Sequence, residues 1–152
     1  MENKNNIQKI VVEFFLFLIV MIITGYLFNY LNHRFFHYSS KDSDFSELIK
    51  KNFFFLIAIA GPVIETIIFI WIPISILKNF KVNNLWLLVL IPSILFASSH
   101  IYHPIYFIMA FIHGILMNIY FQCNAKRSVY EALGLVTLLH GTYNLYGFLF
   151  VM

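Results

Sequence analysis

Residues 53–77 read FFFLIAIAGPVIETIIFIWIPISIL, and this run decides which kind of fold the chain can adopt. Its only ionisable side chain is Glu65, which lies close to the middle of the run. A helix needs about 20 predominantly apolar residues to cross the hydrocarbon core of a bilayer. The run therefore predicts a transmembrane helix with one acidic group at membrane depth.

The composition of the whole chain extends this interpretation. Hydrophobic residues make up 61% of the 152 residues and charged residues only 11%, whereas a soluble domain usually carries about 25% charged residues. Lipid must therefore contact much of the surface. The net charge of +3 is small, and the basic residues lie between the apolar runs. The expected partner is the lipid bilayer and not nucleic acid.

Four further apolar runs predict, with the first, an all-α fold: a polytopic transmembrane helical bundle of about five spans. We expect residues 1–52 to form an N-terminal anchor helix and a polar connector, and residues 53–152 to form a four-helix core. The N-terminal run is too long for a signal peptide and should remain as an anchor. The connector, residues 32–52, has room for a short amphipathic turn at the headgroups. The four further spans cover about residues 10–30, 85–100, 104–121 and 129–152.

The loop charges give a weak indication of orientation. With five spans, the N-terminus and the loops near Lys78 and Lys126 share one face, which carries six basic residues against four on the opposite face. The excess of Lys and Arg in cytoplasmic loops then favours a cytoplasmic N-terminus. Lys50 and Lys51, in the first connector, favour the reverse.

Glu65 is the most informative residue of the chain. A charged side chain at the centre of a span costs roughly 2.5–3.5 kcal/mol even on the more lenient insertion scale. Glu65 should therefore face the interior of the bundle, where it must be paired, hydrated or protonated. A protonated glutamic acid that bonds a neighbouring helix is the structural alternative to a functional group.

Three further polar residues lie in apolar segments. His100 ends the third run in FASSH, and His140 and Asn144 lie four apart in HGTYN, so they share one helix face. Each alone is explained by a helix cap or by a polar seam between helices. Taken together with Glu65, they predict one hydrated pocket that satisfies all four polar groups.

Two chemistries suit Glu65, His100, His140 and Asn144. In the first, Glu65 is a general base toward water, His100 orients the water or passes the proton, and the other two donate hydrogen bonds to an oxyanion. In the second, the acid and the two histidines bind zinc and leave one position open for water. The HExxH helix signature of zinc proteases is absent, so the first version, without a cofactor, is favoured.

The remaining marked residues have mainly structural interpretations. His113 lies in the middle of the fourth run and could line the same pocket or bond a backbone carbonyl. His103, before Pro104, is expected to cap a helix. Solvated or incidental roles are expected for His33, His37, Cys123, Glu13 and Glu131.

Three segments together resemble a known family. GPVIETIIF at 61–69, FASSH at 96–100 and HGTYN at 140–144 follow one another on successive predicted spans. Their order and spacing resemble the three motifs of the CPBP family, the CAAX-protease and bacteriocin-processing group that is also called Abi. The resemblance covers about two thirds of the chain, from residue 53 to the C-terminus.

The resemblance implies an intramembrane endopeptidase. By it, Glu65 and His100 activate water, while His140 and Asn144 shape the oxyanion site. Family members cleave peptide bonds near or within the membrane, in prenylated proteins, leader peptides or signalling peptides, and some confer immunity to bacteriocins. A peptide or protein substrate, a bacterial inner membrane location and an oligomer or partner membrane protein are the corresponding expectations.

The chain departs from the first motif at two positions. Thr66 stands where the family has a second glutamate, and Ile70 stands where it has an arginine. The alternative function is therefore a non-catalytic relative that binds a peptide or partner protein, as in bacteriocin immunity or scaffolding. A cofactor or transport protein, with histidines binding haem, metal or protons, is a further alternative, although no histidine pair has the spacing of a metal site on one helix.

Overall fold

Helices make up all the regular structure in the described part of the chain. The computed structural model describes residues 2–38 and 54–150. The predicted all-α membrane bundle is confirmed within these residues. The predicted amphipathic turn falls mainly in 39–53, which lies outside the described residues.

The helices follow the predicted runs closely. Helix α1 (Glu2–Leu31) continues as a π-helical turn, Asn32–Phe36. The second span is a broken helix, made of the π turn Leu56–Ala60, α3 (Gly61–Thr66), the π turn Ile67–Trp71 and α4 (Ile72–Asn79). Three helices complete the bundle: α5 (Leu85–Ser98), α6 (Pro104–Ala125) and α7 (Val129–Phe150).

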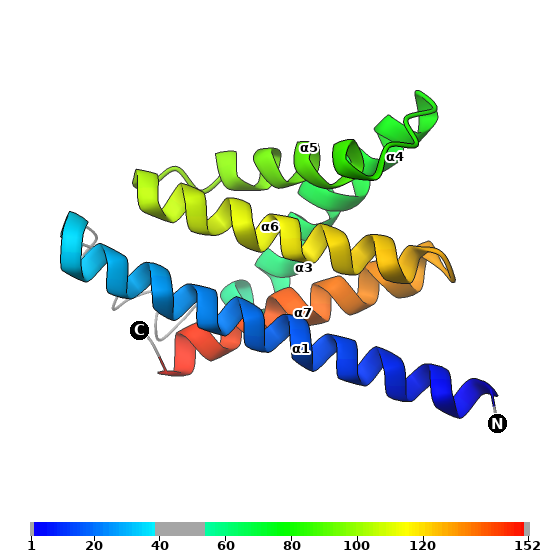
Figure 1. The fold of residues 1–152 in the computed structure, drawn as a ribbon, viewed down its shortest axis with the longest axis horizontal. Coiled ribbons are helices and arrows are strands. Elements are labelled where there is room, and N and C mark those ends of the chain that lie inside the picture. The colour runs from blue at the N-terminus through cyan, green and yellow to red at the C-terminus, as the bar shows by residue number, and fades with distance from the viewer. Residues whose placement is uncertain (1, 39–53, 151–152) are drawn as a thin grey trace.

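Helix α6 is the central element of the bundle. It packs against α5 on one side and α7 on the other, while α1 crosses both α6 and α7 (Figure 1). Helix α3 packs against α7. The side chains at the centre of this arrangement are fully buried, and they include Met117, Tyr120, Val136 and Leu139.

Three helical stretches are long and apolar enough to cross a bilayer: Ile7–Phe36, Leu56–Asn79 and Pro104–Ala125. Helix α5 is apolar but only 14 residues long. Helix α7 has the length of α6 but carries Glu131, His140 and Asn144, which lower its hydropathy. Many large apolar side chains of α1 and the broken helix are exposed, as expected for a surface solvated by lipid. The chain is an integral membrane protein.

Prolines explain the breaks in the second span. Pro62 has no N–H and its ring crowds the carbonyl four residues earlier, so a regular α-helix cannot pass through it. The N–H of Gly61 instead reaches the carbonyl of Leu56, five residues back. This register leaves the carbonyls of Ile57 and Ala58 without their usual donors, and both face α7. Pro73 has the same relation to the second π turn, where the N–H of Ile72 reaches the carbonyl of Ile67, five residues back.

Candidate active site

Glu65 is carried by the short α3 segment between the two π turns. Such turns inside α-helices occur frequently at functional sites, because they redirect side chains out of the regular spacing. Glu65 is directed toward α5 and α7, and its side chain is 31% exposed. It therefore lies at an open edge of the bundle and not at its sealed centre.

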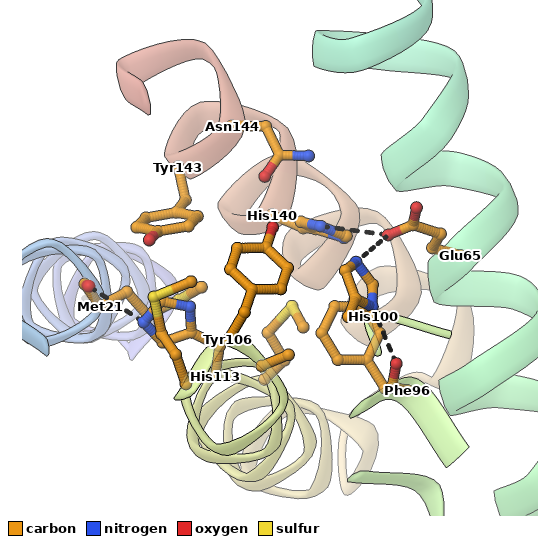
Figure 2. A pocket seen from close by; sticks show the side chains of 12 residues that line it. Met21, Glu65, Phe96, His100, Tyr106, His113, His140, Tyr143 and Asn144 are labelled. Carbon is orange, nitrogen blue, oxygen red and sulfur yellow. Dashed lines mark hydrogen bonds and ion pairs between the residues drawn. The ribbon is translucent and has the colours of Figure 1, made fainter. Parts of the chain in front are cut away.

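Two imidazoles approach the same oxygen of Glu65. Figure 2 shows Oε2 of Glu65 between His100 and His140, with Nε2 of His140 at 3.5 Å and Nε2 of His100 at 3.9 Å. The three residues come from α3, the segment just after α5, and α7. Asn144, one turn beyond His140 on α7, lines the same cavity. The structure thus brings all four predicted site residues together, while their catalytic roles stay predictions.

The hydrogen bonds of His100 define which nitrogen faces Glu65. Its Nδ1 lies 2.9 Å from the carbonyl oxygen of Phe96. Oγ of Ser99 lies at the same distance from Nδ1. In the tautomer whose Nδ1–H donates to the carbonyl of Phe96, the neutral ring presents the lone pair of Nε2 toward Glu65, where it can take up a proton. The ring also packs on Phe96, with centroids 4.5 Å apart.

His140 and Asn144 are engaged differently. His140 is almost fully buried, and its Nδ1 has no hydrogen-bond partner among the described residues. Its Nε2 faces Oε2 of Glu65 at 3.5 Å, without a direct hydrogen bond. Asn144 donates from Nδ2 to the carbonyl of Ile57, at 3.3 Å. That carbonyl is one of the two that Pro62 leaves without a donor, so Asn144 also ties α7 to the broken helix.

The four residues border a cavity of about 90 Å³. A water molecule needs only about 10–15 Å³ of such space, and it needs two to four polar partners. The cavity can thus hold more than one water beside Glu65. Its lining consists of Met21, Glu65, Phe96, His100, Tyr106, Met109, Ala110, His113, Met117, His140, Tyr143 and Asn144.

Several lining residues were not predicted from the sequence. Met21 of α1 and the tyrosines Tyr106 and Tyr143 carry no motif, and only the packing of helices brings them to the cavity. His113 satisfies both predicted options, since it lines the cavity and its Nε2 lies 3.1 Å from the carbonyl of Met21. His103 caps α6 as predicted, with Nδ1 accepting the backbone N–H of Tyr106 at 3.1 Å.

The two departures from the family motif lie away from the cavity. Thr66 is fully buried and Ile70 is 1% exposed. Ile70 belongs to the hydrophobic core, while Oγ1 of Thr66 has no hydrogen-bond partner in the described part of the chain. An apolar contact therefore occupies the place where a buried acid and arginine would have to pair.

The zinc alternative finds no support in the side-chain arrangement. Within 2–38 and 54–150, no three His, Cys, Asp or Glu side chains are grouped so that they could hold a metal ion. Glu65, His100 and His140 instead place two nitrogens near one carboxylate oxygen, at 3.5 Å and 3.9 Å, and this oxygen has no direct hydrogen-bond partner within 2–38 and 54–150.

Comparison with known families agrees with the motifs. A family model described as type II CAAX prenyl endopeptidase Rce1-like matches residues 50–146. The chain belongs to this family of intramembrane CAAX-type endopeptidases, and the family predicted from the three motifs is confirmed. Neither a curated protein nor a solved structure gave a significant match.

Proposed function

We propose that the protein is an intramembrane endopeptidase that hydrolyses a peptide bond with a water activated by Glu65. The observation that carries this proposal is the convergence of two imidazoles on one oxygen of a membrane-embedded carboxylate, beside a cavity with room for water. A general base must lie within hydrogen-bond reach of the proton it removes. A water between Glu65 and His100 meets this requirement.

The proposed reaction needs only groups of this chain, water and the peptide. Glu65 takes a proton from water as the water oxygen bonds to the carbonyl carbon, and the carbonyl oxygen becomes an oxyanion. The C–N bond then breaks as the proton passes to the amide nitrogen, which leaves as an amine. His100 assists because its Nε2 can hold the proton between these steps. The products are a carboxylic acid and an amine.

The surroundings of the cavity support a lipid-modified peptide as substrate. An open apolar groove of about 420 Å³ lies between the broken helix and α5. Phe69 lines this groove and contacts Phe96, whose ring packs on His100. The rings of Phe69 and Phe96 would thus separate an acyl or prenyl chain in the groove from the cavity that holds Glu65. The groove is lined by Ile68, Phe69, Ile72, Pro73, Ile76, Leu77, Ile91 and Leu95.

The decisive experiment is cleavage of farnesylated and unmodified membrane-proximal peptides by the protein in lipid vesicles. We expect Glu65→Gln and His140→Ala to lower the rate at least ~100-fold, the usual range for loss of general acid–base catalysis. Glu131→Gln is the matched control, because Glu131 pairs with Arg127 far from the cavity. Equal rates in all four proteins would remove the proposal, and loss of activity with a zinc chelator would contradict its metal-free form.

The second candidate function is peptide binding without cleavage. It is favoured by Thr66 and Ile70, which replace two charged motif residues with core packing. In this case the wild type and Glu65→Gln would bind the same peptides, and neither would cleave them. Such a result would support the non-catalytic alternative, a protein that binds peptides without cleaving them.

Three expectations, on substrate, location and assembly, rest on the family resemblance and stay proposals. These are leader-type substrates, a bacterial inner membrane and an oligomeric or partner membrane protein. The division into an N-terminal anchor unit, 1–52, and a core, 53–152, is likewise a proposal. In the described structure α1 packs on α6 and α7 and supplies Met21 to the cavity, which argues that the anchor is needed for a complete site.

A further inference from the structure

We infer that the phenol of Tyr106 donates a hydrogen bond to the oxyanion of the tetrahedral intermediate. The inference rests on the proposed function and adds a group that none of the three motifs contains. Tyr106 lies in the first turn of α6 and lines the cavity together with Glu65 and His100. Figure 2 shows its ring extending into the cavity, with the hydroxyl directed toward α7 and the side that carries His140 and Asn144.

The resting hydrogen bonds leave the cavity short of free donors. Nε2 of His140 faces Oε2 of Glu65 at 3.5 Å, so a hydrogen on this nitrogen lies on the side of the carboxylate. Asn144 uses one amide hydrogen on the carbonyl of Ile57, and that bond is needed because Pro62 leaves the carbonyl without a backbone donor. Nε2 of His113 is already engaged on α1, where it lies 2.9 Å from Oγ1 of Thr24 and 3.1 Å from the carbonyl oxygen of Met21. The second amide hydrogen of Asn144 is one donor that remains.

The hydroxyl of Tyr106 is a further free donor. It makes no hydrogen bond to any residue in the described ranges, and it is not among the fully buried atoms that lack a partner. A phenol can donate one hydrogen and accept others. Two donors directed at one developing charge form an oxyanion site, and Tyr106 with Asn144 supplies them from α6 and α7.

The backbone of Tyr106 is held in place, as a precise donor requires. His103 caps α6, and its Nδ1 accepts the N–H of Tyr106 at 3.1 Å. The carbonyl of His103 accepts the same N–H at 3.0 Å. On its side chain, the ring of Tyr106 packs between His100 and Tyr102, with centroid distances of 6.0 Å and 5.4 Å. Little rearrangement is thus needed when the charge forms.

Tyr143 provides a useful contrast within the same cavity. Its hydroxyl lies against the backbone of α1, where a Cβ added at Gly25 would come within 2.7 Å of it. Its ring packs edge-on to His113, with centroids 4.6 Å apart. Tyr143 thus faces α1 and Tyr106 faces α7 (Figure 2), which assigns the oxyanion contact to Tyr106.

The test compares Tyr106→Phe with Tyr102→Phe in the peptide-cleavage assay. Tyr102 is the matched control, because its ring contacts Tyr106 but its side chain is 79% exposed and does not line the cavity. We expect Tyr106→Phe to lower kcat by about 10²-fold, as loss of one oxyanion donor does, with KM and thermal stability close to those of wild type. Tyr102→Phe should retain full activity.

Each outcome of this test is decisive. Equal kcat in wild type and Tyr106→Phe would overturn the inference while the proposed function stood, as would a loss that appeared only in KM or in the melting temperature. A wild type that cleaves no peptide would overturn both, because an oxyanion contact has no meaning without the reaction. A fall in kcat confined to Tyr106→Phe supports the inference.

Discussion

Glu65 shows how a single acidic residue can be retained in a membrane helix. Among the described residues no Lys or Arg pairs with its carboxylate, which faces two imidazoles and a small cavity. Imidazoles can donate or accept a hydrogen bond, so with a water in the cavity they can serve the acid in either protonation state. This is a suitable environment for a group that must exchange protons during catalysis.

Thr66 and Ile70 stand where the family has an acid and an arginine, and we predict that the effects of restoring these two residues on stability depend on each other. Ile70→Arg alone should destabilise the protein by about 3–5 kcal/mol, because it buries an unpaired charge in the core. Thr66→Glu together with Ile70→Arg should recover part of this loss, since the two positions are four apart and can pair. Denaturation of the purified variants in detergent measures the difference.

Additive losses in the double variant would contradict this prediction. Thr66→Val serves as the control, because Oγ1 of Thr66 has no hydrogen-bond partner among the described residues. Its stability should equal or exceed that of wild type.

At the residue scale, the sequence identifies site residues that are polar or charged and therefore costly in lipid. It does not identify site residues of types that are common in membrane helices. Glu65, His100 and His140 were predicted because each is expensive in an apolar run. Tyr106 and Met21 were not, since tyrosine and methionine are common in membrane helices and one sequence contains no contacts. Thr66 and Ile70 were noticed only as departures from the family motif.

At the scale of elements, the broken second span positions the site. Its two π turns bracket α3 and turn Glu65 toward α5 and α7. The apolar runs predicted five helices with ends close to those observed, because the length of an apolar run must match the thickness of the hydrocarbon core that the helix crosses. The π turns could not be predicted in position, although Pro62 and Pro73 indicate where regular hydrogen bonding fails.

Close approach of α7 to the first π turn is predicted to be essential for the site. A Cβ at Gly141 would come 2.6 Å from the carbonyl oxygen of Ala58. Gly141→Ala should therefore push α7 away and separate His140 and Asn144 from Glu65. We expect a loss of about 1–3 kcal/mol in stability and a cleavage rate at least ~10-fold lower.

Gly147→Ala is the control for this prediction. It lies on the same helix, and nothing stands within 4 Å of its added Cβ. It should keep full activity and gain slightly in stability, since alanine favours helix over glycine. An active, stable Gly141→Ala protein would show that the close contact is not required.

At the scale of the molecule, the Tyr106 side of the cavity and the loops that carry six of the basic residues lie toward opposite ends of the bundle. The N-terminus of α1 and the connection from α6 to α7 lie at one end (Figure 1), and Cys123, near that connection, is exposed. Tyr106 and His100 flank the connection from α5 to α6 at the other end. With the basic end cytoplasmic, as the excess of loop Lys and Arg favours, we predict that the Tyr106 end of the cavity faces the outer side of the membrane.

Cysteine labelling tests this orientation without any assay of activity. A membrane-impermeant maleimide should leave Cys123 unlabelled in right-side-out membrane vesicles and label it after permeabilisation. Tyr102→Cys, made in a Cys123→Ser background, should be labelled before permeabilisation, since position 102 is exposed at the opposite end. The reverse pattern would place the cavity on the cytoplasmic side.

The central claim is that Glu65 delivers water to a peptide bond, and the most direct measurement is mass spectrometry of peptide products formed in H₂¹⁸O. The wild-type protein in vesicles should generate a new C-terminus that carries one ¹⁸O atom, and Glu65→Gln should generate at least ~100-fold less of it. The same labelled product at the same rate from both proteins would contradict the claim.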